Sequence, residues 1–139
     1  MTPRYAIRSA APPDAQALLA LWRDADAEVT QTDDLAGVEG LLAHDPAAVL
    51  LADAAGTVIG SLIAAWDGWR GQLYRLAVHP GWRRQGIATA LVRAGEERLH
   101  GLGARRVAAI VVADHVHARG FWQAVGYGQV AQVRFVRSL

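Results

Sequence analysis

With 139 residues and a formal net charge of +1, the chain has the length of one domain, 1–139, and gives no case for nucleic acid or an acidic membrane as its main partner. It has no cysteine, which excludes disulfides, thiolate metal sites and a cysteine nucleophile. Its first residues lack the apolar core of a secretory signal, and no apolar run approaches about 20 residues, so we expect a cytoplasmic protein.

Hydropathy alternation and turn residues predict six strands and four helices. The first strand alternates around Tyr5 and Ile7, and Pro12 begins a helix whose apolar face includes Trp22. The continuous apolar run at 106–112 is typical of a strand in the middle of a sheet. Because no repeat or linker interrupts this order, we expect one compact α/β domain. The predicted strands are 4–9, 48–53, 57–66, 72–78, 106–112 and 130–136, and the predicted helices are 12–22, 35–43, 85–100 and 115–125.

Residues 76–91 carry the strongest functional signal. An apolar run stops at a Pro-Gly turn, and a basic loop then opens an amphipathic helix near Gly86. The first N–H groups of a helix lack partners within it, and the helix dipole attracts anions to that end. Gly86 has no side chain and Ala88 has a small one, which lets a phosphate approach the backbone closely. The segment therefore predicts a phosphate-binding site.

Two other phosphate-binding motifs fit the glycines of this part of the chain less well. Gly81 and Gly86 have the spacing of a Walker A loop, but Ile and Ala follow where that loop needs Lys and Ser or Thr. Gly101 and Gly103 resemble half of a dinucleotide-binding fingerprint, but they follow a helix and no third glycine arrives. We therefore expect neither a nucleoside-triphosphate hydrolase nor a Rossmann domain.

Two blocks of the chain resemble the GNAT superfamily of acyl-CoA-dependent N-acetyltransferases. Residues 83–88, Arg-Arg-Gln-Gly-Ile-Ala, are similar to the Q/R-x-x-G-x-G/A motif of that family, and 76–80 resemble its fourth strand and exit turn. Residues 118–127 resemble its A-x-x-F-Y-x-x-x-G-F helix and turn. The resemblance implies an α/β (α+β) fold with a mixed, mostly antiparallel sheet of about six to seven strands and about four flanking helices. It also implies that the fourth and fifth strands splay apart.

The resemblance implies that the cofactor is acetyl-CoA, with its pyrophosphate on the backbone N–H groups of 84–89. Arg83, Arg84 and Arg119 are candidates for the phosphates, and each is equally well explained as a solvated arginine. The backbone of Leu76 and Val78 would face the pantetheine arm, and the Val78 N–H would polarise the thioester carbonyl. The expected cofactor-binding residues are Leu76, Ala77, Val78, Arg83, Arg84, Gln85, Gly86, Ile87, Ala88, Thr89, His115, Arg119 and Trp122.

The proton-transfer groups are where the chain departs from the family. A tyrosine of the late helix usually serves as the acid, and the matching residue is Trp122, whose indole N–H is not a usable acid. A glutamate on the fifth strand is the base in one branch of the family, and the matching residue is Ile110. Other branches use a glutamate on the fourth strand, at the place of Tyr74, which would relay a proton, contact the substrate or pack. The acid and the base stay unassigned, and Tyr74 and the Val78 backbone are the catalytic candidates.

His115 stands where many members of the family carry an asparagine that contacts the pantetheine arm. A surface residue at the start of a helix is the alternative explanation. His115 and His117 form an H-x-H pair without an evident third ligand, so we expect no metal site.

The segment between the first two helices is acidic and is a candidate for acceptor binding. Its carboxylates, which include Glu28 and Asp33, would attract a cationic amine. Solvated loops and helix caps also collect Asp, and Asp33 before Leu35 has the place of such a cap. Trp22 continues an apolar stripe and belongs to the core, whereas Trp69 lies in a turn and is a candidate for the pocket. The expected acceptor-binding residues are Glu28, Asp33, Trp69 and Tyr74.

These observations predict an N-acetyltransferase that moves an acetyl group from acetyl-CoA to a primary amine by direct attack in a ternary complex. The acceptor is a small molecule or a peptide, and the sequence does not choose between them. The alternative is an acyl-CoA-binding sensor of the same fold, because the usual Tyr and Glu are missing. The chain is a monomer or a homodimer, and the apolar residues Val133, Phe135 and Val136 of the last predicted strand are candidates for pairing subunits.

Overall fold

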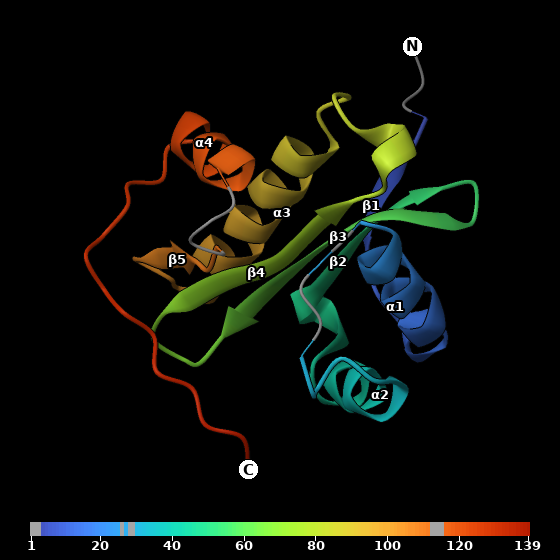
Figure 1. Ribbon diagram of the computed structural model, residues 1–139, viewed down its shortest axis with the longest axis horizontal. Coiled ribbons are helices and arrows are strands. Elements are labelled where there is room, and N and C mark those ends of the chain that lie inside the picture. The colour runs from blue at the N-terminus through green and yellow to red at the C-terminus, as the bar shows by residue number, and fades with distance from the viewer. Residues whose placement is uncertain (1–3, 26, 28–29, 112–115) are drawn as a thin grey trace.

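The computed structural model describes residues 4–25, 27, 30–111 and 116–139, and its centre is one twisted sheet (Figure 1). Five strands of the described chain lie in the order β1-β2-β3-β4-β5. The first four pair antiparallel, and β5 pairs parallel to β4. The strands are β1 (Ala6–Ser9), β2 (Val49–Ala54), β3 (Thr57–Trp66), β4 (Gly71–Val78) and β5 (Val107–Ala109).

Helices cover both faces of this sheet (Figure 1). Because strand side chains alternate between faces, Leu51 and Ile63 pack with the first two helices, whereas Leu50 and Leu62 pack with the last two. Three single-turn 3₁₀ segments, at Pro12–Asp14, Pro46–Ala48 and Pro80–Trp82, each begin at a proline. The helices are α1 (Ala15–Asp24), α2 (Leu35–His44), α3 (Ile87–Leu102) and α4 (Val116–Ala124).

Glycine lets α3 lie close to the sheet. A Cβ added at Gly95 of α3 would meet the Leu62 side chain at 2.9 Å, and one added at Gly71 of β4 would meet Leu99 of α3 at 2.7 Å. Real Cβ atoms do not approach so closely, so both positions need glycine or a shift of the helix. This close packing holds the N-terminus of α3 beside the end of β4.

β4 and β5 pair over a short stretch and then separate. Their register covers only 71–73 of β4, and the Ile110 N–H adds one bond to the Leu73 carbonyl at 3.0 Å. The pairing of β3 with β4 shifts register between Ser61 and Ile63, and Arg75 on β4 has a left-handed φ of 56°. A bulge of this kind bends its strand and increases the twist. The second half of β4 therefore opens away from β5, as the family resemblance predicts.

The α/β class, the four helices and the splayed strands are confirmed, but three expectations about the sheet are wrong. The described sheet has five strands rather than about six to seven, because 130–136 forms no strand. β5 is the last strand of the described sheet rather than a central one. The apolar composition of a strand predicts that it is buried, but not whether helices or neighbouring strands bury it. Here α3 and α4 cover one face of β5, and no strand pairs with its outer edge in the described part. No helix within the described ranges is long and apolar enough to cross a membrane.

Candidate active site

The N-terminus of α3 forms an open concave turn. Gly86 is the N-cap with φ 78°, Arg84 before it has φ 63°, and no side chain caps the helix. A Cβ added at Gly86 would meet nothing within 4 Å, so the space beside this residue is open. Ile87 is buried and anchors the helix start, whereas Gln85 and Thr89 are exposed. The first N–H groups of α3 therefore have no side-chain cap, and the helix end has the polarity that attracts an anion.

Arg83 and Arg84 stand exposed beside this turn. None of the ion pairs of the described residues involves either guanidinium. The neighbouring Trp82 ring is covered instead by Arg4, whose guanidinium lies 4.8 Å from the ring centroid. Both arginines can therefore turn toward an anion at the helix end without breaking a described ion pair.

The open half of β4 presents backbone groups toward the splay. The His79 N–H donates to the Ile59 carbonyl of β3 at 2.8 Å, so His79 and Ala77 direct their backbone groups to β3. By the alternation of a strand, the N–H and C=O groups of Leu76 and Val78 point the opposite way. Their side chains pack against the core on the α3 side. The result is a row of strand-type donors and acceptors that ends beside the α3 turn.

A buried polar network holds the bulge of β4. Ser61, fully buried on β3, accepts a hydrogen bond from Trp22 Nε1 at 2.9 Å and donates one to the Arg75 carbonyl at 2.8 Å. The Arg75 guanidinium lies 5.1 Å from the Trp22 ring centroid and forms an ion pair with Asp33. Asp33 also accepts from the Thr30 N–H at 2.7 Å. The network ties the segment between α1 and α2 to the place where β4 leaves β5.

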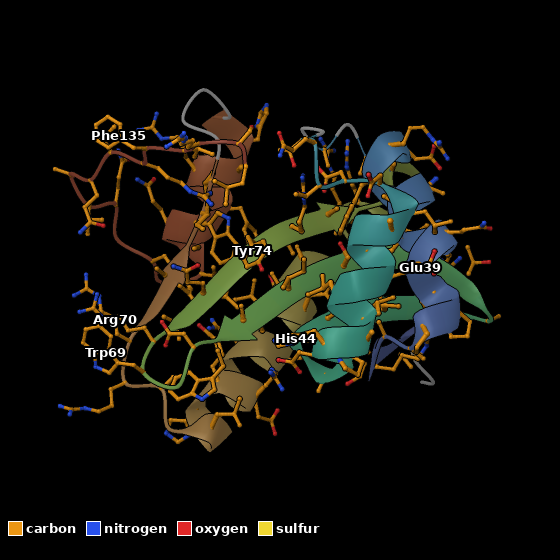
Figure 2. All side chains as sticks on the ribbon, turned by 90° about the horizontal axis from the view of Figure 1, so that it is seen from below. Glu39, His44, Trp69, Arg70, Tyr74 and Phe135 are labelled. Atoms are coloured by element: carbon orange, nitrogen blue, oxygen red, sulfur yellow. The ribbon has the colours of Figure 1, made fainter. Side chains whose placement is uncertain are left out.

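Tyr74 lies one residue before this bulge, in the middle of the sheet on the face of α1 and α2 (Figure 2). Its side chain is half-buried. Burial raises the pKa of the Tyr74 phenol, and the charges of Arg134 and Arg75 oppose that rise. The phenol therefore stays protonated near neutral pH and is able to donate a hydrogen bond.

The sequence and the fold both have known relatives. The sequence model of the acetyltransferase (GNAT) family matches residues 8–127. The chain belongs to this family. An acetyltransferase of Pectobacterium atrosepticum is 33% identical over 117 residues, which cover 84% of this chain and 83% of that protein.

Solved structures share the fold. Aminoglycoside N-acetyltransferase AAC(6')-Iy in complex with CoA aligns with a TM-score of 0.78 and 22% identity over 99% of both chains. The PaiA N-acetyltransferase of Thermoplasma acidophilum, in complex with coenzyme A, aligns with a TM-score of 0.80 and 16% identity over 92% of this chain and 91% of that one. At these identities the likeness shows a common GNAT architecture.

In the late helix of this GNAT chain, the residue at the position of the family's tyrosine acid packs against its neighbours. Trp122 is only 6% exposed, and its ring makes edge contacts with Phe121 and Tyr127 at centroid distances of 5.4 and 5.0 Å. The Tyr127 hydroxyl donates to Glu96 of α3 at 2.7 Å, and burial together with this bond raises the pKa of Tyr127. Both aromatic residues therefore fasten the end of α4 to α3.

Several other predicted site residues lie away from the α3 turn and the bulge of β4. Trp69 is exposed at the β3–β4 turn, where the Arg70 guanidinium lies 4.0 Å from its ring centroid, and in Figure 2 both point away from the body. Arg119 donates to Gln129 at 3.0 Å and lines a cavity beside β5. Asp34, rather than Asp33, caps α2 by accepting from the Gly37 N–H at 2.7 Å.

Two of the predicted residues, Glu28 and His115, lie outside the described residues. The H-x-H pair therefore has no described geometry. Within the described ranges, no three His, Asp or Glu side chains form a group that could hold a metal ion.

Arg75 and Ser61 are the site residues that the sequence analysis missed. The signal for Ser61 is a lone hydroxyl in the apolar run of β3, because a buried polar side chain needs partners. Arg75 has no such signal, since its partners Asp33 and Trp22 are distant in the chain and meet it only in the fold.

Proposed function

We propose that the protein transfers an acetyl group from acetyl-CoA to a primary amine by direct attack in a ternary complex. One observation carries the proposal: β4 opens from β5 beside the uncapped N-terminus of α3. The opening provides a strand edge for an extended, amide-bearing chain, and the helix end provides a place for its phosphates. Two proteins of similar fold were solved with CoA, which supports the same donor here.

The residues present fit such a donor. The N–H groups of the first turn of α3 would bind the pyrophosphate, with Arg83 and Arg84 closing over it. The backbone of Leu76 and Val78 would pair with the amides of the pantetheine arm. The open space in front of Gly86 leaves room for a phosphate at the backbone, which a side chain there would reduce.

When bound, acetyl-CoA supplies an activated acyl group as a thioester. The Val78 N–H would donate to the carbonyl oxygen as negative charge develops on it during attack. Tyr74, protonated and half-buried beside the bulge, would contact the acceptor or relay a proton to the departing sulfur. A thiolate needs less protonation than an alkoxide, so Trp122 in place of a tyrosine is compatible with turnover.

The acidic segment between α1 and α2 would attract a cationic acceptor toward this opening. Because Asp33 forms an ion pair with Arg75, it would hold the segment against β4 rather than bind the amine directly. The acceptor would be a small-molecule or a peptide amine that enters from the face of α1 and α2.

A free-thiol assay with acetyl-CoA and a panel of amines, including amino sugars, polyamines and peptides, tests the proposal. We expect release of CoA that depends on at least one amine. Tight binding of acetyl-CoA with no turnover across the panel would contradict it and favour an acyl-CoA sensor, for which the burial of Trp122 at the usual acid position is the supporting observation.

Charge reversal beside the helix end tests the donor site. The Arg83→Glu/Arg84→Glu variant should bind CoA roughly 10–100-fold more weakly in calorimetry, because two phosphate contacts become repulsive. The control Arg70→Glu/Arg105→Glu changes the net charge equally with exposed arginines near the opposite end of α3 and should keep its affinity. Equal losses in both variants would mean that only net charge matters and that the donor site lies elsewhere.

A further inference from the structure

The two sides of the opening at β4 are built from parts of the chain with opposite charge. Residues 23–45, which run from the end of α1 through α2, include seven Asp or Glu and one Arg. Residues 104–139, which follow α3, include five Arg and one Asp. Figure 1 shows α1 and α2 on one side of β4, and β5, α4 and the C-terminal segment on the other. An acceptor at this opening therefore lies between a negative side and a positive side.

Arg134 is the cation of the positive side that reaches the acceptor face of β4. It lines the cavity of about 900 Å³ beside β5, together with Gln72 and Ile110. Gln72 and Tyr74 share a face of β4, because they are two residues apart in a strand. Burial raises the pKa of the Tyr74 phenol, and the charge of Arg134 opposes this rise more than does that of Arg75, the next residue. Because water and salt screen exposed charges beyond short distances, Arg134 lies close to the phenol.

The guanidinium of Arg134 is available to a ligand. None of the ion pairs of the described residues involves it. By contrast, Arg75 pairs with Asp33, and Arg119 donates to Gln129. A guanidinium binds a carboxylate with two parallel hydrogen bonds. Arg134 can therefore bind an anionic group beside Tyr74 without giving up a described ion pair.

The described carboxylates of the negative side nearest the opening already have partners in the fold. Asp33 pairs with Arg75, and Asp34 caps α2. These groups attract an ammonium through their field. A polyamine or an amino sugar with several ammonium groups would place one of them beside Arg134, where like charges repel. A molecule with one ammonium and one carboxylate matches both sides.

We propose that the acceptor is a free amino acid, and that Arg134 binds its carboxylate while its amine faces the open half of β4 beside Tyr74. This proposal rests on the proposed function and names the substrate class of the same site. Figure 2 shows Tyr74 between the C-terminal segment, which carries Phe135, and α2, which carries Glu39. The ammonium is drawn to the negative side and the carboxylate to the positive side, so the amino acid enters in one orientation.

The reaction of such an acceptor is a balanced acetyl transfer. The ammonium gives up one proton to become the neutral amine, and a second proton leaves the nitrogen as it forms a bond to the carbonyl carbon of the thioester. The C–S bond breaks, and the sulfur leaves with the bonding electron pair and takes up a proton. The products are an N-acetylamino acid and CoA. The carboxylate takes no part in the bond changes, and its contact with Arg134 orients the amine.

Matched acceptors test the need for the carboxylate. A free-thiol assay with acetyl-CoA compares the standard amino acids, and the best of them is then compared with its carboxamide, which keeps the shape and removes the negative charge. We expect kcat/KM to be roughly 10–100-fold higher for the amino acid, because the amide loses a charge-assisted pair of hydrogen bonds. Equal values, or higher values for polyamines and amino sugars than for every amino acid, would overturn the inference.

Substitution of Arg134 tests the residue. Arg134→Gln should lower kcat/KM for the amino acid roughly 10–100-fold, chiefly through KM, and change the value for the amide by less than about twofold. Arg134→Lys, which keeps the charge, should lose less than Arg134→Gln. Arg137→Gln removes the same charge from the same segment, lies outside the cavity lining and should leave both values unchanged. Equal losses for the amino acid and the amide, or for the two Gln variants, would show that Arg134 does not bind the carboxylate.

Binding without turnover separates this inference from the proposed function. Calorimetry titrates each standard amino acid and its amide into the CoA-bound protein. If no amine releases CoA in the assay, the proposed function fails, and tighter binding of an amino acid than of its amide, lost in Arg134→Gln, would still support the carboxylate site. If amines turn over with no preference for a carboxylate, the proposed function stands and this inference fails. Absence of both turnover and amino-acid binding would overturn both.

Discussion

Arg75 has a backbone conformation that costs a residue with a side chain about 1–3 kcal/mol. Its φ of 56° persists because its carbonyl accepts from the buried Ser61 and its guanidinium pairs with Asp33 over Trp22. The side chains of Arg75 and Asp33 are only 18% and 11% exposed. At this site a strained residue is held by partners from three other parts of the chain, and the splay of β4 depends on it.

A double-mutant cycle measures this pair. Arg75→Ala and Asp33→Ala, alone and together, should give a coupling of about 1.5–3 kcal/mol in urea unfolding, because the charged hydrogen bond is largely shielded from water. The Arg93–Glu96 pair of α3, with exposures of 58% and 31%, is the control and should give about 0.3–0.5 kcal/mol. Equal couplings would show that shielding from water does not strengthen the Arg75–Asp33 pair.

Among the elements, α3 carries both the candidate phosphate site and much of the core. Leu91, Val92 and Leu99 are fully buried, and Gly95 sits where a side chain would strike Leu62 and Leu73. The helix therefore cannot shift outward without moving its N-terminus away from the end of β4. Close packing of one element is what positions the site.

Gly95→Val tests that packing. We expect a loss of about 1–3 kcal/mol of unfolding free energy, because the added methyl groups overpack a site already at van der Waals distance. Gly101→Val, on the same helix with nothing within 4 Å of an added Cβ, should change stability by at most about 0.5 kcal/mol. Thermal and urea unfolding would show whether the two substitutions differ in their effect on stability. Similar losses of unfolding free energy would mean that the low helix propensity of valine, rather than overpacking, causes the effect.

At the scale of the whole molecule, ion pairs connect the N-terminal strand to the rest of the fold. Arg8 of β1 donates to Asp53 of β2 at 2.9 Å and to Asp14 before α1 at 2.8 Å. The hydrogen bonds from Arg8 hold the pKa values of Asp14 and Asp53 below the ordinary 3.8. At the alkaline end of the pH range, burial and the hydrogen bond to Glu96 raise the pKa of Tyr127 above the ordinary 10.0.

These directions predict the pH dependence of stability. The carboxylates stabilise the fold above about pH 4, and that contribution is lost as pH falls through their lowered folded values. The Tyr127 contribution is complete below about pH 10 and is lost as pH rises through its raised folded value. Urea midpoints should therefore be level between these limits. Arg8→Met should flatten the acid limb and leave the alkaline limb unchanged, and an unaltered acid limb would show that other carboxylates control it.

The order of the elements and the phosphate-binding turn could be predicted from sequence, because both depend on local features. The turn residues 54–56 mark the start of β3, whose observed bounds are the predicted 57–66, and Gly86 needs a left-handed conformation that no other residue adopts as readily. The helix at 87–102 ends at Gly103, with φ 106°, as a C-terminal glycine predicts. Each of these depends on residues within a few positions of one another.

Only the tertiary structure decided how those parts meet. The Arg75–Asp33 contact joins residues 42 positions apart, and no local pattern predicts it. The apolar run at 106–112 and the apolar residues of 130–136 indicate strands that need partners. A partner is a long-range choice, and the fold leaves the outer edge of β5 and the C-terminal segment unpaired in the described part of the chain. The sequence by itself determined the elements and the phosphate-binding turn through backbone preference and hydropathy. The tertiary structure decided the splay, the network that holds it and the open edge, because these depend on contacts between distant residues.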